Sequence, residues 1–272
     1  MPVVSHVFSD GADRPALVLI HGLGSAATIW KSLTPHLISH FKVFAVDLPG
    51  HGVASINENE RVDPKSLAVA IIDDLEKSHG ISESHVAGNS LGGWIALEMG
   101  AASPDKIKSI TALAPAGLWK SGPTGTLPPS IDSRILAKIS QYFMRIAYHL
   151  PFLKALGYKK ITHLWRELSF ESCRDSVLAM AKSKGYFPLW RGLKGRSFDS
   201  VIRNDVAVSI IFGDADLTLP PDIAQDKNVA PQHSEWIEVD NCAHVIMWNY
   251  PDLTVELIQK NSEKAERRDA SR

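Results

Sequence analysis

The chain contains little cysteine: Cys173 and Cys242 are the only two among its 272 residues. They do not form a C-x-x-C pair, so the sequence predicts neither a disulfide framework nor a cysteine zinc site. It also lacks the H-E-x-x-H and H-x-x-E-H runs that bind zinc, and the G-x-x-x-x-G-K-[ST] and G-x-G-x-x-G loops that hold phosphates. We therefore expect no metal ion and no cofactor.

Long apolar runs and an excess of one charge are absent as well. No run approaches the roughly 20 residues that span a bilayer, and residues 1–6 lack the basic stretch and apolar core of a signal peptide. The formal net charge of −1 argues against nucleic acid as a partner. The expectation is a soluble, cytoplasmic protein, in which 44% hydrophobic residues build a sizeable core.

Short apolar runs, each ended by Gly, Pro or Asp, alternate with stretches at helical spacing. This alternation favours an α/β fold with a mostly parallel central sheet that is covered by helices on both faces. Such sheets bind their ligands at the carboxyl ends of the strands. The expected strands are 16–20, 42–47, 84–88, 107–113 and 206–212, and the expected helices lie near 26–39, 64–79, 91–102 and 221–229.

The stretch 118–200 interrupts this alternation. It opens on the turn-rich segment 122–129, and apolar residues then recur at helical spacing along 131–150. We predict a helical cap at 118–200, inserted into a core domain formed by residues 1–117 and 201–272. The cap has 14 Lys and Arg against five Asp and Glu, a net charge of +9, whereas the core domain carries −10. The favoured interpretation is a solvated basic surface, and recruitment of anionic substrates or of an anionic membrane surface is the alternative.

Ser90 stands between two glycines in the frame Gly88-Asn89-Ser90-Leu91-Gly92, where a β-prone run gives way to a helix-prone one. A strand that turns directly into a helix forces its turn residue into strained backbone angles, and flanking glycines remove Cβ atoms that would collide. The serine hydroxyl then lies at the carboxyl end of the strand, where the helix N-terminus favours negative charge. A plain helix N-cap is the alternative interpretation of Ser90.

A serine hydroxyl becomes a nucleophile when a neighbouring base accepts its proton and an acid orients that base. Asp214 and Asp216 follow the apolar run 208–212, and His244 follows the run 236–239. Serine, acid and histidine thus each come after a strand of their own, which predicts that they meet at one edge of the sheet.

Five motifs occur in order along the chain: His21-Gly22-Leu23-Gly24, Asp47-Leu48-Pro49-Gly50-His51-Gly52, Gly88-Asn89-Ser90-Leu91-Gly92, Gly213-x-x-Asp216-x-x-x-Pro220 and Ala243-His244. With them the chain resembles the α/β-hydrolase superfamily over nearly its whole length. The resemblance implies Ser90 as nucleophile, His244 as general base and Asp216 as the orienting acid. The spacing from Asp216 to Pro220 favours it over Asp214.

The same resemblance implies an oxyanion hole formed by the backbone N–H groups of Leu23 and Leu91. His21 and His51 lie in motifs at strand ends, where we expect them to hold loops by hydrogen bonds rather than to transfer protons. We expect Asp47 to brace the loop that follows its strand.

The implied machinery predicts a serine hydrolase that acts on a small-molecule carboxylic ester with an apolar acyl group, through an acyl-enzyme. The candidate residues of the substrate pocket are Trp165 and Trp190 in the cap and Trp248 in the core domain. Because the nucleophile is a serine, relatives that use an aspartate nucleophile are excluded.

Two alternatives stay open. The first is a hydrolase of carbon–carbon bonds in β-diketone-like ring-cleavage products, which shares the Asn89-Ser90 pair. Relatives of that type carry Gly-Pro-Gly after the first His-Gly and a tryptophan after the catalytic histidine, where this chain has Gly24-Ser25-Ala26 and Val245. The second alternative is a ligand receptor that retains the three catalytic residues and moves its cap on binding.

Overall fold

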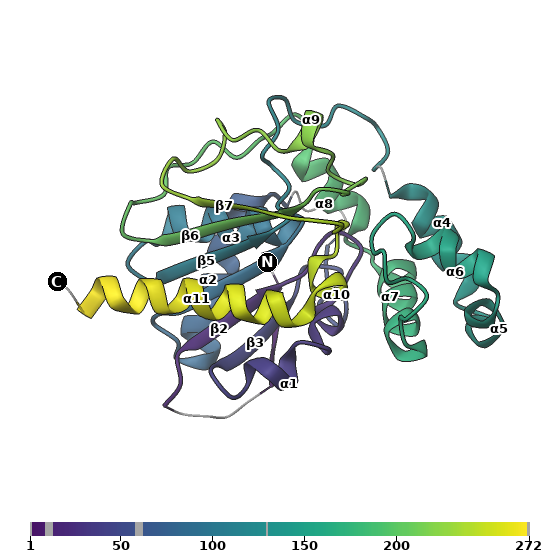
Figure 1. Cartoon of the computed structure of the whole chain (residues 1–272), viewed down its shortest axis with the longest axis horizontal. Coiled ribbons are helices and arrows are strands. Elements are labelled where there is room, and N and C mark those ends of the chain that lie inside the picture. Colours follow the sequence, from purple (N-terminus) through teal and green to yellow (C-terminus); the bar gives the residue numbers. More distant parts are fainter. Residues whose placement is uncertain (1, 9–12, 58–61, 129, 271–272) are drawn as a thin grey trace.

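The computed structural model describes residues 2–8, 13–57, 62–128 and 130–270. Within these residues, a seven-stranded sheet in the order β1-β3-β2-β4-β5-β6-β7 forms the centre of the molecule. Strand β1 pairs antiparallel with β3, and the other pairings are parallel. The strands are β1 Val4–Val7, β2 Ala16–Ile20, β3 Lys42–Asp47, β4 Ser84–Asn89, β5 Ile107–Leu113, β6 Ala207–Gly213 and β7 Glu235–Val239 (Figure 1). The predicted α/β fold with a mostly parallel sheet is confirmed.

The central strands are apolar because both of their faces are covered. Every residue of β2, β4 and β6 is buried, as expected for parallel strands between two helical layers. The edge strand β1 was not among the expected strands. Its sequence Val-Ser-His-Val is short, mixed and partly exposed, so it carries no apolar run that would mark it.

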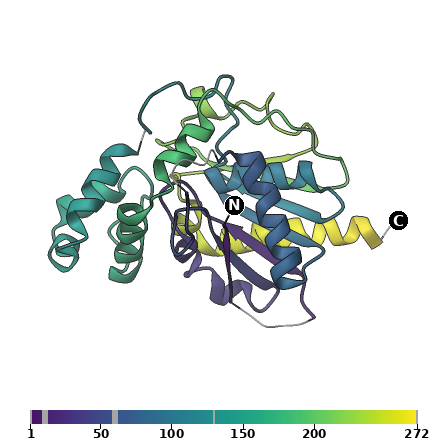
Figure 2. The ribbon, with the colours of Figure 1, turned by 180° about the vertical axis from the view of Figure 1, so that it is seen from behind.

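Helices cover both faces of the sheet. Helices α2 and α3 lie on one face, and α11 crosses the other (Figures 1 and 2). No helix in the described part of the chain is both long and apolar enough to cross a bilayer. The helices are the 3₁₀ turn η1 Ala27–Trp30, α1 Thr34–Leu37, α2 Pro64–His79, α3 Leu91–Ala102, α4 Ile131–Ser140, α5 Met144–His149, α6 Pro151–Tyr158, α7 Phe170–Lys182, α8 Tyr186–Leu193, α9 Pro221–Ala224, α10 Ile246–Asn249 and α11 Pro251–Ala270.

Three expected helices are shorter or divided. The stretch 26–39 holds only η1 and α1, because the N–H groups of Lys31 and Leu33 donate to carbonyls three residues earlier, as in a 3₁₀ turn. The stretch 221–229 ends as a helix at Ala224, since the Asp226 N–H donates to the Leu118 carbonyl instead of to a helical one. Residues 131–150 divide into α4 and α5. Helix α11 was not expected from the sequence.

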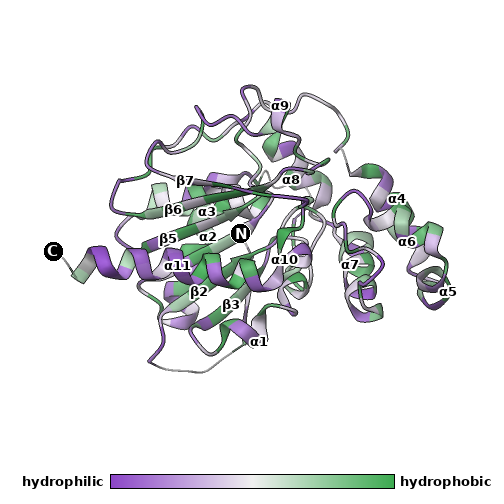
Figure 3. Ribbon diagram, in the orientation of Figure 1, coloured by the Kyte–Doolittle hydropathy of each residue, from purple (hydrophilic) through white to green (hydrophobic). Residues whose placement is uncertain are grey.

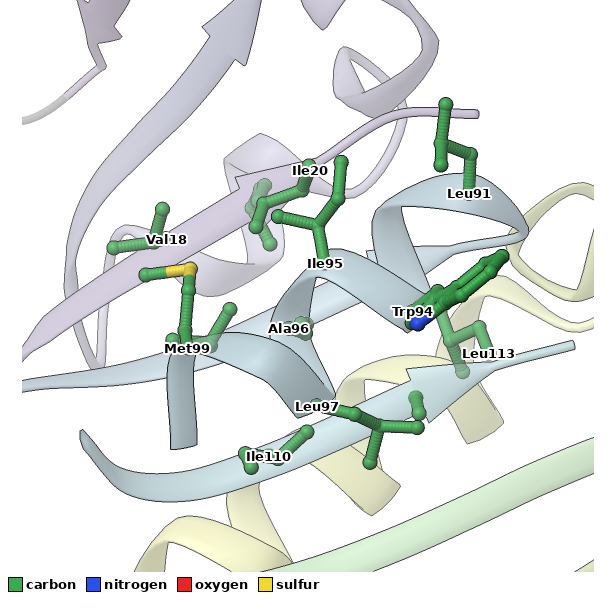
Figure 4. Packing of buried hydrophobic residues seen from close by; sticks show 14 of the residues in the cluster. Val18, Ile20, Leu91, Trp94, Ile95, Ala96, Leu97, Met99, Ile110 and Leu113 are labelled. Atoms are coloured by element: carbon green, nitrogen blue, oxygen red, sulfur yellow. The ribbon is translucent and has the colours of Figure 1, made fainter. Parts of the chain in front are cut away.

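Helix α3 is the buried centre of the fold. All residues from Leu91 to Gly100 are buried, which suits a helix that is apolar on every side. Figure 4 shows Ile95 beside Ile20 of β2 and Leu97 near Ile110 of β5. The first turn of α3 is thereby held tightly against the carboxyl ends of β2 and β4.

The residues between β5 and β6 form α4 to α8, beyond the carboxyl ends of the strands (Figure 1). Their packing differs along the segment. Leu189, Trp190 and Leu193 of α8 join the main hydrophobic core, whereas Tyr158, Trp165, Leu168 and Cys173 form a small second core of their own. The division of the chain into a core domain and a cap domain at 118–200 stays a prediction. The last helix of this stretch, α8, packs into the main core.

The close approach of β4 to α3 yields a test. A Cβ at Gly88 would overlap the Gly92 carbonyl and come within 2.8 Å of Gly93 N. Gly88→Ala must therefore push the first turn of α3 away from β4. We expect it to cost about 3 kcal/mol or more. Gly80→Ala is the matched control, because Gly80 has a positive φ of 66° but open space around it, and should cost roughly 1–2 kcal/mol. Thermal unfolding measures both, and equal midpoints would contradict the packing argument.

Candidate active site

Ser90 lies at the sharp turn between β4 and α3, with φ 58° and ψ −119°. A positive φ is strained for a residue with a side chain, so the surrounding structure must impose it. Three backbone hydrogen bonds do so: Ser90 N–H donates to Leu113 O at 2.9 Å, and Ser90 O accepts from Trp94 N–H at 3.2 Å and Ala116 N–H at 3.0 Å. Ser90 occupies the N-cap position of α3, but its side chain makes no capping hydrogen bond to the helix.

His244 and Asp216 form a short, buried hydrogen bond. His244 Nδ1–H donates to Asp216 Oδ2 at 2.7 Å, from the loop after β7 to the loop after β6. The other oxygen, Asp216 Oδ1, accepts the N–H groups of Thr218 at 2.7 Å and Leu219 at 2.9 Å. These contacts fix the carboxylate, and a proton on Nδ1 leaves His244 Nε2 as the proton acceptor of the neutral ring.

Asp216 is ionised at this site although it is buried. Burial by itself raises the pKa of Asp216, but the electrostatic attraction to the His244 ring, its hydrogen bond and the two backbone N–H donors lower it more. The pKa of Asp216 therefore falls below its ordinary value.

Asp214 holds the loop that carries His244 and makes no hydrogen bond to His244 itself in the described residues. Its Oδ1 accepts the Cys242 N–H at 3.2 Å and so ties the loop that carries His244 to the end of β6. The structure thus pairs His244 with Asp216 rather than with Asp214, as the spacing to Pro220 predicts. Burial raises the pKa of the Cys242 thiol to about 12, so this thiol stays protonated beside the site.

Asn89 joins the serine turn to the histidine loop, a role that the sequence analysis did not assign to it. Its buried Nδ2 donates to Leu113 O at 3.1 Å and to His244 O at 3.2 Å. Within the described residues, no hydrogen bond joins Ser90 Oγ to His244. Hydrogen bonds between nucleophile and base are often long in a resting enzyme and tighten when substrate binds.

The loop after β2 lies close to the side chain of Ser90. A Cβ at Gly22 would lie 3.1 Å from Ser90 Cβ and 3.6 Å from Ser90 Oγ, so this loop runs directly beside the hydroxyl. The Gly24 N–H is held by His51 Nε2 at 3.1 Å. In the part of the chain that the structure describes, the N–H groups of Leu23 and Leu91 have no hydrogen-bond partner, which leaves both free to bind a ligand oxygen.

Histidines His21 and His51 hold the loops at this edge of the sheet, as expected. His21 Nε2 accepts the Leu48 N–H at 3.1 Å, and each ring donates its Nδ1–H to a nearby carbonyl. These bonds require neutral rings. Burial lowers the pKa of His21, and burial together with the proximity of the His21 ring lowers the pKa of His51 to about 3.

Asp47 braces the neighbouring loops, which confirms that prediction. It accepts the N–H groups of Ala27 at 2.8 Å and Val53 at 3.0 Å, and it also bonds to His6 Nε2 at 2.8 Å. Burial raises the pKa of Asp47, but these three donors outweigh it, so the pKa lies below its ordinary value. The buried carboxylate of Asp47 thus holds together the loop that contains Ala27 and the loop that contains Val53.

The three tryptophans proposed for the pocket lie in different places. Trp165 packs in the second core and Trp190 in the main core, whereas Trp248 bridges both and borders a cleft between η1 and α7. Lys31 links the walls of this cleft by an ion pair with Asp175 at 2.6 Å. All three assignments stay predictions, and Trp248 borders an open space.

The described residues contain no group of three or more His, Cys, Asp or Glu side chains that is placed to hold a metal ion. The chemistry that the site can perform on its own residues is proton transfer and nucleophilic attack, with two backbone N–H groups to stabilise negative charge.

Curated relatives share parts of this sequence. An uncharacterized carboxylesterase of Bacillus subtilis is 34% identical over 116 residues, which cover 41% of this chain and 37% of that protein. A pimeloyl-(acyl-carrier protein) methyl ester esterase of Neisseria meningitidis is 25% identical over 236 residues, which cover 83% of this chain and 70% of the esterase. The chain spans about a third of the length of the relatives that match at 33 and 34% identity.

Solved structures share the fold. The enol-lactonase from Burkholderia xenovorans LB400 superimposes with a TM-score of 0.70 at 17% identity, over 95% of each chain. A family model described as "Alpha/beta hydrolase family" matches residues 17–257, which is most of the chain. Together with the sheet order and the turn at Ser90, this match shows that the chain belongs to the alpha/beta hydrolase family.

Proposed function

We propose that the protein is a serine hydrolase that cleaves a carboxylic ester with an apolar acyl group through an acyl-enzyme. The observation that carries this proposal is the 2.7 Å hydrogen bond from His244 to the ionised Asp216, beside the strained turn at Ser90. A base held in one tautomer next to a partly exposed serine is the arrangement that nucleophilic acyl transfer requires.

In the first half of the reaction, Ser90 Oγ attacks the ester carbonyl carbon while His244 Nε2 accepts its proton. The carbonyl oxygen becomes an oxyanion and binds the N–H groups of Leu23 and Leu91. When the tetrahedral intermediate collapses, His244 gives the proton to the leaving alkoxide, and the acyl group remains on Ser90.

In the second half, a water molecule attacks the acyl-enzyme and His244 again accepts the proton. Collapse of the second tetrahedral intermediate releases the carboxylic acid and returns the proton to Ser90. Asp216 stays ionised throughout, because its work is to hold the His244 ring and to stabilise the imidazolium that forms twice in each cycle.

The apolar surroundings of the serine support an apolar acyl group. The loop that carries Leu23 packs against Met180 and Tyr186, since a Cβ on Gly24 would lie 2.5 Å from Met180 Sδ and 3.2 Å from the Tyr186 ring. Trp248 and Ile29 are the apolar side chains of the neighbouring cleft, whose other lining residues are polar or charged. An acyl chain that lies against Met180 and Tyr186 therefore leaves water for apolar side chains.

The purified protein can be tested with p-nitrophenyl acetate, butyrate, octanoate and laurate and with a ring-cleavage dienoate. We expect many turnovers on at least one ester, with kcat/KM rising as the acyl chain lengthens to fill the apolar site. Turnover of the dienoate alone would instead identify the carbon–carbon bond hydrolase. Release of one equivalent per protein, with no further turnover, would identify a receptor.

The nucleophile has a direct test. Ser90→Ala removes one hydroxyl from a turn that is held by backbone hydrogen bonds, so we expect the fold to persist and kcat to fall on the order of 10⁶-fold. A fluorophosphonate probe should label the wild-type protein and leave the variant unlabelled. Labelling that survives in Ser90→Ala would place the nucleophile elsewhere.

The two carboxylates give a matched pair of variants. Asp216→Asn removes the anion that fixes the His244 tautomer, so we expect kcat to fall about 10⁴-fold. Asp214→Asn keeps an acceptor for the Cys242 N–H and should leave kcat within about tenfold of wild type. Steady-state kinetics on the preferred ester measure both, and a larger loss in Asp214→Asn would assign the orienting role to Asp214.

A further inference from the structure

The outer part of the inserted segment carries an unusual surface. Six large apolar side chains on and between α4, α5 and α6 are each more than half exposed, and Tyr142 reaches 85%. We call them the exposed apolar face: Ile135, Ile139, Tyr142, Ile146, Phe152 and Leu156. A soluble protein seldom concentrates so many exposed apolar side chains in one short segment unless another surface binds there.

The fold does not use this face. Helices α4, α5 and α6 pack mainly on one another and on α7, and they extend from the end of the molecule opposite the C-terminus (Figure 1). Figure 3 colours parts of the α4 and α6 ribbons as hydrophobic. The buried side chains of the three helices point elsewhere: Arg134, Ala137, Ala147 and Tyr158 are among those that face the inside.

The charges beside the exposed apolar face are nearly all positive. The exposed charged side chains of residues 131–160 are Lys138, Arg145, Lys159 and Lys160, against Asp132 alone. The whole segment 118–200 carries a net charge of +9. An occupant of this face must therefore offer both apolar depth and negative charge.

We propose that the exposed apolar face docks on an anionic lipid bilayer, with its apolar side chains in the acyl region and its cations among the headgroups. Apolar side chains flanked by Lys and Arg on short helices have the composition that binds at such an interface. A symmetric pairing with a second copy would bring two positive surfaces together. In the described residues, the other aliphatic side chains that are more than half exposed come from separate segments: Val53, Val69, Leu127, Val201, Leu217 and Ile223.

The helices that carry the exposed apolar face reach the serine site through Arg134, Met180 and Tyr186. Arg134 of α4 donates to Met180 O at 2.7 Å and lies over the Tyr186 ring at 4.6 Å. Met180 and Tyr186 in turn pack against the loop that carries Leu23. On the basis of the proposed function, the ester substrates are lipids that enter the site from the bilayer, beside the docked helices.

Vesicle flotation tests the docking without catalysis. Ser90→Ala protein is mixed with vesicles of phosphatidylcholine, alone or with one third phosphatidylglycerol, so that failure of the hydrolase assignment leaves this measurement intact. We expect binding to the anionic vesicles, little binding to the neutral ones, and release when the ionic strength rises from about 0.1 to 1 M, which shortens the Debye length from roughly 10 to 3 Å.

Variants of the face locate the contact. Added to Ser90→Ala, the changes Ile139→Ser, Tyr142→Ser and Ile146→Ser together, or Phe152→Ser and Leu156→Ser on α6, should weaken vesicle binding about tenfold or more. Val201→Ser is the control, since Val201 is 88% exposed outside the segment. With Ser90 restored, the same variants should retain wild-type turnover of p-nitrophenyl butyrate, which shows that they fold.

Each of three results would overturn the proposal. The first is that the wild-type face binds no anionic vesicles. The second is that the face variants bind as well as the Val201→Ser control. The third is a stable dimer by size-exclusion chromatography that the face variants convert to a monomer, which would assign the face to a second copy of the chain.

Discussion

The close packing of α3 against β2 and β4 is the constraint on which the site depends. Glycine at positions 88 and 92 lets the backbone of the helix come where a Cβ would overlap the carbonyls of Gly92 and Ile20. The helix can then begin immediately after β4, and the turn residue between them must accept a positive φ. Because the apolar sides of α3 are buried in the main core, the packing energy of the whole sheet holds Ser90 in this strained position.

Electrostatics around the serine follow from burial and from backbone donors. Asp216 and Asp47 are buried yet keep pKa values below their ordinary range, because each collects several hydrogen bonds that outweigh the cost of burial. His21 and His51 are neutral, because burial disfavours their charged forms. The site therefore contains fixed anions and neutral loop histidines, and His244 is the histidine that the ionised Asp216 faces.

The inserted segment is buried in the main core at its end and exposed to solvent in its first helices. Its last helix, α8, belongs to the main core, and Tyr186 at the start of α8 lies against the loop of Leu23. Its first three helices leave apolar side chains in solvent among exposed cations. The buried Arg134 of α4 lies over the Tyr186 ring of α8 at 4.6 Å and donates hydrogen bonds to Met180 O and Ser183 Oγ at the end of α7. These contacts join the outer helices to the part of the segment that packs against the loop of Leu23.

The sequence by itself determined the sheet and the order of the chemical groups. Continuous apolar runs ended by Gly, Pro or Asp mark buried parallel strands, and β2 to β6 lie where such runs predict them. The resemblance of five short motifs to the α/β-hydrolase superfamily also implied the pairing of His244 with Asp216 that the structure shows. These features are visible because each depends on residues that are neighbours along the chain.

Other features were decided only by the tertiary structure. The edge strand β1 forms because β3 offers it hydrogen bonds, and its own residues carry no apolar run. Asn89 ties Ser90 to the His244 loop across 155 positions of sequence. Periodicity along 131–150 revealed apolar residues, but which of them are covered depends on α7 and on the rest of the fold. Spacing shows the side of a helix on which a residue lies, and only the packed neighbours determine whether that side meets protein or solvent.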